Sequence, residues 1–272
     1  MILLLILLLL ALLYLFCLHG RRGHRLLPIF RAQRFAHRGY HDKPQIPENS
    51  LPAFRRAIAR GWGAELDVHL LKDGTLAVFH DSDLFRCTGV HGRIEDLTLS
   101  ELRALRLEGT DEKIPLFDEV LALFEHATPL IIELKSENAN HYALTKAVCE
   151  RLDSYTGVFC IESFDPFCLL DLKKLRPEIC RGQLSMNFMK EPSGLPFYKR
   201  VIAGNLLLNF LTRPDFIAYK FEDRRDLSPL LCRSLWGIQE VSWTIRRRED
   251  LQAAEKERAI AIFERFDPDE PA

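Results

Sequence analysis

Short β-like apolar runs alternate with amphipathic helical stretches from about residue 34 to the C-terminus, and this rhythm restricts the fold more than any other feature of the sequence. Such alternation is typical of an α/β protein. Leu71-Lys72-Asp73-Gly74 joins the second and third runs as a hairpin turn, which leaves eight strands besides one extra hairpin strand. Eight strands with intervening helices in about 240 residues predict a (β/α)₈ TIM barrel, and a doubly wound sheet is the alternative.

The predicted elements follow from apolar spacing and from start signals. Ser50 precedes Leu51-Pro52 and Asp165 precedes Pro166, as expected of helix N-caps. The predicted strands are 34–37, 64–70, 76–80, 129–134, 157–163, 181–186, 215–221, 239–245 and 259–263. The predicted helices are 50–60, 100–107, 117–126, 140–153, 166–175, 201–211, 229–235 and 247–257.

The N-terminus predicts a membrane segment. Residues 1–18 are uncharged and almost wholly apolar, and they lack the basic n-region and small-x-small site of a cleavable signal peptide. Eighteen residues span about 27 Å as a helix, close to the ~30 Å hydrocarbon core. We expect a transmembrane helix at 1–18, a basic linker at 19–33 and a catalytic domain at 34–272. The basic cluster at 19–25 predicts a cytoplasmic-facing domain.

The charge balance excludes a general affinity for nucleic acid. The chain carries 37 basic and 38 acidic residues, a formal net charge of −1, so any anion must be bound by a local arrangement of charges. The seven cysteines show no CxxC spacing and no density typical of a disulfide scaffold.

Charged side chains gather at the predicted C-terminal ends of neighbouring strands, where the active sites of TIM barrels lie. Glu65 and Asp67 are two apart on one strand and therefore leave the same face. Such carboxylates repel each other unless a cation lies between them. With Glu133 on a neighbouring strand, they form the oxygen cage that Ca²⁺ or Mg²⁺ prefers. The sequence therefore predicts a divalent metal site.

Two histidines and two cations accompany this predicted metal site. His37 and Arg38 follow the first strand, His80 ends the hairpin strand, and Lys135 follows Glu133. The cations can offset phosphoryl charge, while one imidazole removes a proton and the other protonates a leaving oxygen. Each residue alone is more often structural. Their joint placement favours phosphodiester cleavage.

The sequence resembles the glycerophosphodiester phosphodiesterases, a family of the phospholipase C-like phosphodiesterase superfamily, over about residues 33 to 265. The shared motifs are His37-Arg38-Gly39-Tyr40, Pro47-Glu48-Asn49-Ser50, Glu65-Leu66-Asp67-Val68, Lys72-Asp73-Gly74, Val78-Phe79-His80-Asp81, Arg86-Cys87-Thr88-Gly89, Leu97-Thr98-Leu99-Ser100-Glu101-Leu102, Ile114-Pro115, Glu133-Leu134-Lys135, Glu162-Ser163-Phe164 and Trp243-Thr244.

The resemblance implies a TIM barrel with an insertion at about 81–116 and metal-dependent hydrolysis of glycerophosphodiesters to glycerol 3-phosphate and an alcohol. It implies that His37 and His80 are the acid/base pair, that Glu65, Asp67 and Glu133 hold the metal, and that Arg38 and Lys135 face the phosphate. Glu48, Phe164 and Trp243 are implied to support the site. Leu116 and Ile245-Arg246 depart from the family pattern, which bears on substrate fit rather than on the reaction.

Two other functions stay open. A lysophospholipase D-type enzyme could act on membrane lysophospholipids, with the apolar segment 188–208 as an acyl-binding lip. That segment is also typical of an ordinary packing helix with its preceding loop. A catalytically silent, membrane-bound binding protein is the other alternative, but it would not need both histidines and all three carboxylates.

Overall fold

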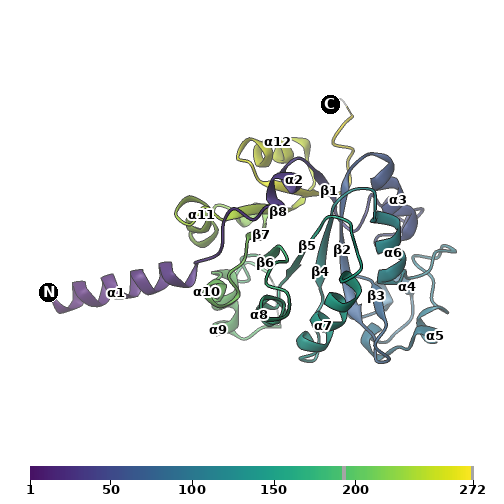
Figure 1. Ribbon diagram of the computed structural model, residues 1–272, viewed down its shortest axis with the longest axis horizontal. Helices are drawn as coiled ribbons and strands as arrows, with labels where there is room; N and C mark the ends of the chain where they lie inside the picture. Colours follow the sequence, from purple (N-terminus) through teal and green to yellow (C-terminus); the bar gives the residue numbers. More distant parts are fainter. Residues whose placement is uncertain (192–193, 271–272) are drawn as a thin grey trace.

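The computed structural model describes residues 1–191 and 194–270, and its centre is a closed barrel of parallel strands (Figure 1). The sheet order is β1-β9-β8-β7-β6-β5-β4-β2-β3, and β1 also pairs with β2. Because β3 is an antiparallel hairpin strand on β2, eight of the nine strands form the barrel, as the sequence predicts. The strands are β1 Arg34–Ala36, β2 Gly63–Leu70, β3 Leu76–Val78, β4 Leu130–Leu134, β5 Phe159–Ser163, β6 Arg181–Ser185, β7 Phe216–Lys220, β8 Gln239–Ile245 and β9 Ile260–Phe263.

Helices connect and surround these strands, and both predicted N-caps are confirmed. The Ser50 side chain accepts a hydrogen bond from the Ala53 N–H, and Asp165 accepts one from Phe167. The α-helices are α1 Ile2–Cys17, α2 Leu27–Arg31, α3 Leu51–Ala59, α4 Phe85–Thr88, α5 Leu99–Leu102, α6 Phe117–Phe124, α7 His141–Leu152, α8 Pro166–Leu175, α9 Phe197–Gly204, α10 Asn209–Thr212, α11 Leu227–Ser234 and α12 Arg248–Lys256. Two short 3₁₀ helices cover Ile94–Asp96 and Phe221–Asp223.

Two helix predictions are wrong. The single helix expected over 201–211 is split into α9 and α10, because Leu206 adopts φ 58° and interrupts the helical hydrogen bonds. The helix expected over 100–107 is only the four residues of α5, which begins at a capping box made by Thr98 and Glu101. The surrounding segment between β3 and α6 instead packs a small apolar core around Cys87, Ile94 and Leu102.

The N-terminal end of the barrel is closed by residues that the sequence places in a linker. Leu27 and Phe30 on α2 are 2 % and 1 % exposed and pack with apolar side chains of the barrel strands. Phe30 stacks on Phe35 of β1 with 5.6 Å between ring centroids. Arg21 forms a 2.7 Å ion pair with the buried Asp215, so residues 19–33 include structured parts of the barrel floor.

Phe30 therefore offers a test of this floor. Replacing it by alanine should lower the free energy of unfolding by about 3–5 kcal/mol, because a buried aromatic ring is lost and a cavity remains. Urea unfolding measures the change. Ile29→Ala is the matched control, since Ile29 is 42 % exposed on the same helix and should change stability by less than about 1 kcal/mol. Equal losses in both variants would contradict the barrel-floor role.

Helix α1 projects away from the barrel, with most of its apolar side chains exposed (Figure 1). It has 16 residues, and the next residue, Leu18, is fully buried against Leu206 and Ile217. Sixteen residues rise about 24 Å, short of the ~30 Å hydrocarbon core. In the described part of the chain, no helix is long and apolar enough to cross a membrane. The transmembrane helix expected at 1–18 is therefore not supported, nor are the membrane attachment and the sidedness that rested on it.

Candidate active site

The predicted site residues converge at the C-terminal end of the barrel. His37 and Arg38 follow β1, Glu65 and Asp67 lie on β2, and Glu133 lies on β4. These strands are neighbours, because β2 pairs with both β1 and β4. His80 follows β3 and Lys135 follows β4, so both join the same rim.

The three predicted metal ligands lie together. Asp67 and Glu133 are register partners across β2 and β4, and Glu65 lies two residues before Asp67 on the same face. One carboxylate oxygen from each of the three residues lies within 4.8 Å of the other two, and all three residues are buried. This geometry suits a hard divalent cation.

Their electrostatics also suit a cation. Burial and the neighbouring Asp67 carboxylate raise the pKa of Glu65 well above its ordinary value. Burial raises the pKa of Glu133 to about 7, against the opposing effect of Lys135. Burial also favours the neutral form of Asp67, but Lys135, His80 and Arg38 outweigh it and hold that pKa well below the ordinary value. Without a bound ion, the nearby cations do not fully compensate the negative charge of three buried carboxylates. The cluster therefore fits a divalent metal.

Lys135 and Arg38 border this carboxylate cluster. Lys135 Nζ lies 2.8 Å from Glu133 Oε1 and 3.1 Å from Asp67 Oδ1. Arg38 Nε lies 3.6 Å from Asp67 Oδ2. The backbone N–H of Arg38 donates to Glu65 at 3.0 Å, with Arg38 in the left-handed region at φ 55°. Both cations can therefore meet an anion that approaches the cluster.

His37 is oriented by an acidic residue that the sequence reading missed. Its Nδ1 lies 2.7 Å from Glu264 Oε2, just after β9. A carboxylate accepts, so Nδ1–H donates and Nε2 is left as the basic nitrogen, 3.9 Å from Glu65 Oε2. Burial and the Arg38 charge lower the pKa of His37 to about 4. The ring is therefore neutral at pH 7 and able to accept a proton.

His80 has a similar partner. Its Nδ1 lies 2.5 Å from Asp81 Oδ1, which again leaves Nε2 as the basic nitrogen. Burial and the Lys135 charge lower the pKa of His80. Its backbone is held as well, because His69 Nε2 lies 3.2 Å from the His80 carbonyl oxygen and His69 Nδ1 lies 2.7 Å from Glu95. The chain thus fixes both the ring and the backbone of His80.

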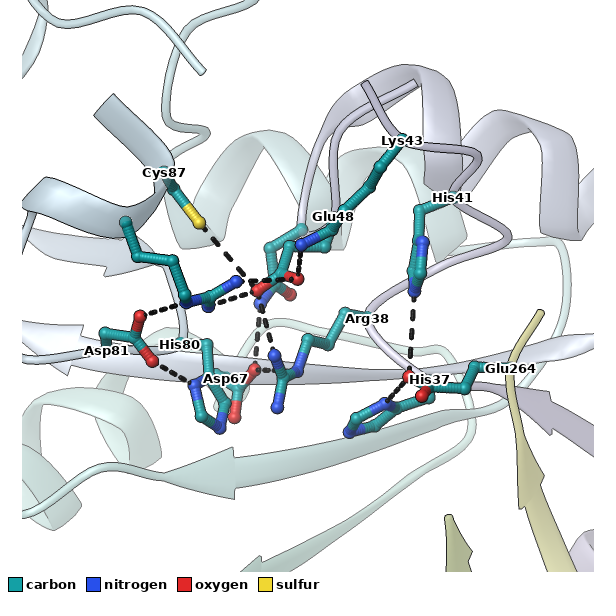
Figure 2. A network of polar contacts seen from close by, with 12 residues as sticks. His37, Arg38, His41, Lys43, Glu48, Asp67, His80, Asp81, Cys87 and Glu264 are labelled. Carbon is teal, nitrogen blue, oxygen red and sulfur yellow. Dashed lines mark hydrogen bonds and ion pairs between the residues drawn. The ribbon is translucent and has the colours of Figure 1, made fainter. Parts of the chain in front are cut away.

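In Figure 2, Asp67 and Arg38 lie between His80 on one side and His37 on the other. Glu48 lies behind Arg38, whose Nη1 donates to Glu48 Oε1 at 2.9 Å. Arg86 Nη2 also donates to Glu48, at 2.6 Å, and Lys43 forms an ion pair with it. Although burial opposes ionisation, these cations hold the pKa of Glu48 well below its ordinary value. Glu48 therefore positions Arg38 and is not one of the clustered carboxylates.

Phe164 and Trp243 lie on the other side of the rim. Their rings meet edge to face with centroids 5.6 Å apart. Phe164 borders a cavity of about 900 Å³ that His80, Glu133 and Lys135 also line. Trp243 contacts Phe164 but is not among the residues that line this cavity.

Several polar residues of the site had no predicted role. Among them are Asn49, which donates to Asp67 at 2.8 Å, the two histidine partners Asp81 and Glu264, and Glu162, a register partner of Glu133. Glu162 is 1 % exposed, its Oε2 has no hydrogen-bond partner, and burial raises its pKa well above the ordinary value. These residues lie at strand ends or within the motifs shared with the family, and those positions were the features of the sequence that could have indicated a role in the site.

Residues 37–215 match the sequence pattern of the glycerophosphoryl diester phosphodiesterase family. The chain belongs to this family. A family enzyme from Caldanaerobacter subterraneus, named glycerophosphodiester phosphodiesterase, is 30 % identical over 80 % of the chain and 87 % of its own length. Human lysophospholipase D GDPD1 is 36 % identical over 51 % of the chain, a match that covers 45 % of the human protein.

Solved structures of the family agree with the barrel. A phosphodiesterase from Oleispira antarctica, solved in complex with the product sn-glycerol-3-phosphate, superposes with a TM-score of 0.69 and 26 % identity. The match covers 85 % of this chain and 92 % of the other. The predicted family and enzyme class are thus confirmed, and the chain is a phosphodiesterase.

Proposed function

We propose that this phosphodiesterase hydrolyses glycerophosphodiesters to glycerol 3-phosphate and an alcohol, with a divalent metal ion and with His37 and His80 as the acid/base pair. The observation that carries the proposal is the carboxylate cluster between two histidines, each of which has its Nδ1 held by a carboxylate. The Caldanaerobacter relative and the product named in the Oleispira structure support the same substrate class.

Glu65, Asp67 and Glu133 would hold the ion, and their oxygen ligands favour Ca²⁺ or Mg²⁺. When bound, such an ion supplies positive charge to the phosphoryl oxygens. Arg38 and Lys135 add two further cations at the edge of the cluster, where they orient the phosphate and offset its charge.

The two histidines move protons in this mechanism. The glycerol 2-hydroxyl oxygen forms a bond to phosphorus and gives its proton to one imidazole. The bond from phosphorus to the alcohol oxygen breaks, and the other imidazole protonates the departing alcohol. Water then opens the cyclic phosphate while the histidines exchange roles. A tethered hydroxyl gains a large proximity advantage over free water.

The test of this mechanism compares glycerophosphocholine with its 2-deoxy analogue, which keeps the charge and the leaving group but lacks the internal nucleophile. Wild-type enzyme with Mg²⁺ or Ca²⁺ should release choline from the first compound. The analogue should bind as a competitive inhibitor, with turnover lower by about 10³-fold or more. Comparable turnover of both compounds would mean that water attacks phosphorus directly.

Monoacyl glycerophosphodiesters are a second candidate substrate class, and the cavity beside the cluster favours them. The cavity beside the cluster is far more apolar than a deacylated head group requires, and the human relative is named a lysophospholipase D. Monoacyl glycerophosphodiesters carry the same phosphodiester and the same free glycerol hydroxyl, so the residues described above would cleave them by the same steps.

A further inference from the structure

A second pocket, of about 470 Å³ and strongly basic, lies on the His37 side of the site. His37 and Arg38 form its inner wall, and neither of them lines the larger cavity beside His80. Its other lining residues are His41, Asp42, Lys43, Glu48, Arg86, Arg246, Glu264 and Arg265. Among these described residues, five cationic side chains face three carboxylates, so the pocket has an excess of two positive charges when its histidines are neutral.

Two of these cations come from neighbouring strand ends. Arg246 directly follows β8, and Arg265 lies two residues after β9. The backbone N–H of Glu264 donates to the carbonyl oxygen of Ile245 at 3.0 Å, which holds the two strand ends together. Arg246 Nε donates to Glu264 Oε1 at 2.7 Å, and Arg265 Nε lies 3.3 Å from the same oxygen. A single carboxylate therefore faces two guanidinium groups.

Glu264 cannot neutralise both arginines, because it also accepts the hydrogen bond from His37 Nδ1. The side chains of Arg246 and Arg265 are 44 % and 70 % exposed. Within the described chain, the terminal Nη groups of both residues form no hydrogen bond with the protein. These N–H groups are available to an anion that enters the pocket.

The other outward cations of the pocket are already held by carboxylates. Arg86 donates to Glu48 and to Asp81, and Lys43 forms ion pairs with Glu48 and Glu108. They add positive charge to the wall, but their donors have protein partners. The two arginines at the strand ends are therefore the groups most open to a ligand.

The place of Arg246 in the sequence also sets it apart. Ile245-Arg246 departs from the family pattern, so the shared reaction does not require an arginine at this position. Figure 2 shows Glu264, the partner of Arg246, on the side of Arg38 away from His80. The added charge thus lies beside the reacting centre and opposite the larger cavity.

Resting on the proposed function, we propose that this pocket binds a phosphomonoester carried by the leaving alcohol, with Arg246 and Arg265 as specificity-determining residues. The two arms of a phosphodiester leave phosphorus in different directions. Since the cavity on the His80 side suits the glycerol arm, the basic pocket faces the alcohol. A phosphomonoester carries about −1.5 to −2 charges and three acceptor oxygens, which matches the excess charge and the two guanidinium forks.

The reaction itself is unchanged by this assignment. The bond from phosphorus to the alcohol oxygen breaks, water is added overall, and the products are glycerol 3-phosphate and an alcohol that keeps its phosphate. The volume of the pocket is within the range of ordinary ligand sites, so a short phosphorylated alcohol fits it.

The test uses full-length enzyme, excess Mg²⁺ and glycerophosphodiesters of one three-carbon alcohol whose far end is a hydroxyl, an ammonium or a phosphate. In wild-type enzyme, kcat/KM for the phosphate-ended diester should exceed that for the hydroxyl-ended diester by about tenfold or more, because hydrogen bonds to charged groups are the stronger ones. The ammonium-ended diester should be the poorest of the three. The preference should shrink in about 0.5 M NaCl, since the pocket is open to solvent.

Arg246→Gln and Arg265→Gln should each lower the ratio of the two kcat/KM values, phosphate-ended over hydroxyl-ended, by about threefold or more. The ratio is the readout because both substrates share any effect that reaches His37 through Glu264. Arg246→Lys should keep part of the preference. Arg247→Gln is the matched control, since Arg247 pairs with Asp250 and does not line the pocket, and its ratio should equal that of wild type.

A second readout needs no turnover. By calorimetry on the Mg²⁺-loaded enzyme, a three-carbon bisphosphate should bind more tightly than propyl phosphate by about tenfold or more, and the double variant of Arg246→Gln and Arg265→Gln should abolish the difference. Binding of two propyl phosphate molecules, with no gain from joining the phosphates in one molecule, would make the pocket a separate site for free phosphate and overturn the proposal.

The remaining outcomes separate the pocket from the reaction. Hydrolysis of all three diesters without a preference for phosphate, or a preference that survives in the double variant, would overturn the anion site and leave the proposed function standing. An equal gain from a phosphate placed on the glycerol arm would overturn the assignment to the alcohol. Failure to hydrolyse any diester with Mg²⁺ or Ca²⁺ would overturn the proposed function, and the assignment to a leaving alcohol with it.

Discussion

Replacing His80 or His37 by alanine should lower kcat for glycerophosphocholine by about 10²–10⁴-fold, because each ring is expected to carry a proton in bond making or bond breaking. Each has its Nδ1 held by a carboxylate, so Nε2 is the nitrogen that exchanges protons. Neither ring is needed to hold the cluster of carboxylates. KM should therefore change much less than kcat, and steady-state kinetics on both variants measures the two effects.

His126→Ala is the matched control, because His126 is an exposed histidine away from the site, and its kcat should be unchanged. Glu264→Gln adds a graded variant. The amide can still accept from His37 but no longer carries the charge that stabilises an imidazolium, so its loss in kcat should be smaller than that of His37→Ala. Wild-type rates in either alanine variant, with circular dichroism unchanged, would remove that histidine from the mechanism.

Removing divalent ions should also lower the rate of hydrolysis strongly. Exhaustive chelation should lower the rate by about 10³-fold or more, and Mg²⁺ or Ca²⁺ should restore it, because the ion supplies several kcal/mol of charge stabilisation. The same ion should raise the unfolding temperature. A ligand that binds only the folded state at 100 times its Kd adds about 2.7 kcal/mol of stability.

Glu65→Gln separates metal binding from folding. In the folded state, burial and Asp67 raise the pKa of Glu65 above its ordinary value, so ionised Glu65 destabilises the metal-free fold as the pH rises above about 4.5. The variant should therefore be more stable than wild type without metal at pH 7, because it has no carboxylate to ionise at this buried position. It should also lose the stabilisation by metal and most of the activity.

Glu150→Gln, on an exposed helix surface, is the control and should behave as wild type in every assay. Full activity of chelated wild-type enzyme would contradict the metal requirement. A Glu65→Gln protein that unfolds more easily without metal would instead give Glu65 a structural role.

The barrel was predictable from sequence because each strand has a recognisable pattern within its own few residues. Each is a short apolar run between turn residues, and the structure confirms all nine to within a few residues. The carboxylate cluster was also predictable from sequence. The two-residue spacing of Glu65 and Asp67 places both side chains on one face of the strand, and Glu133 lies near the end of a neighbouring strand. Local spacing sufficed because the parallel ladder places the ends of its strands at one rim.

Features that depend on distant contacts were not predictable in this way. The hydrogen bond that His37 donates to Glu264 joins residues 227 apart in sequence. The apolar character of Leu18 and Phe30 is visible in the sequence, but apolarity alone does not distinguish a lipid environment from packing against the barrel. The break at Leu206 depends on a left-handed backbone angle at a residue type that rarely adopts one.

The pairing of β1 with β9 has a consequence for how the enzyme is assembled. Phe35 is the register partner of Ile262, so the ring of strands closes only after nearly the whole chain has been synthesised. Such distant contacts form late and slow the folding of a chain. His37 meets Glu264 through the same closure, which means that a nascent or partly folded chain lacks an oriented His37. Hydrolytic activity during refolding would therefore report the docking of the last strand, while the growth of helical circular dichroism would report earlier stages.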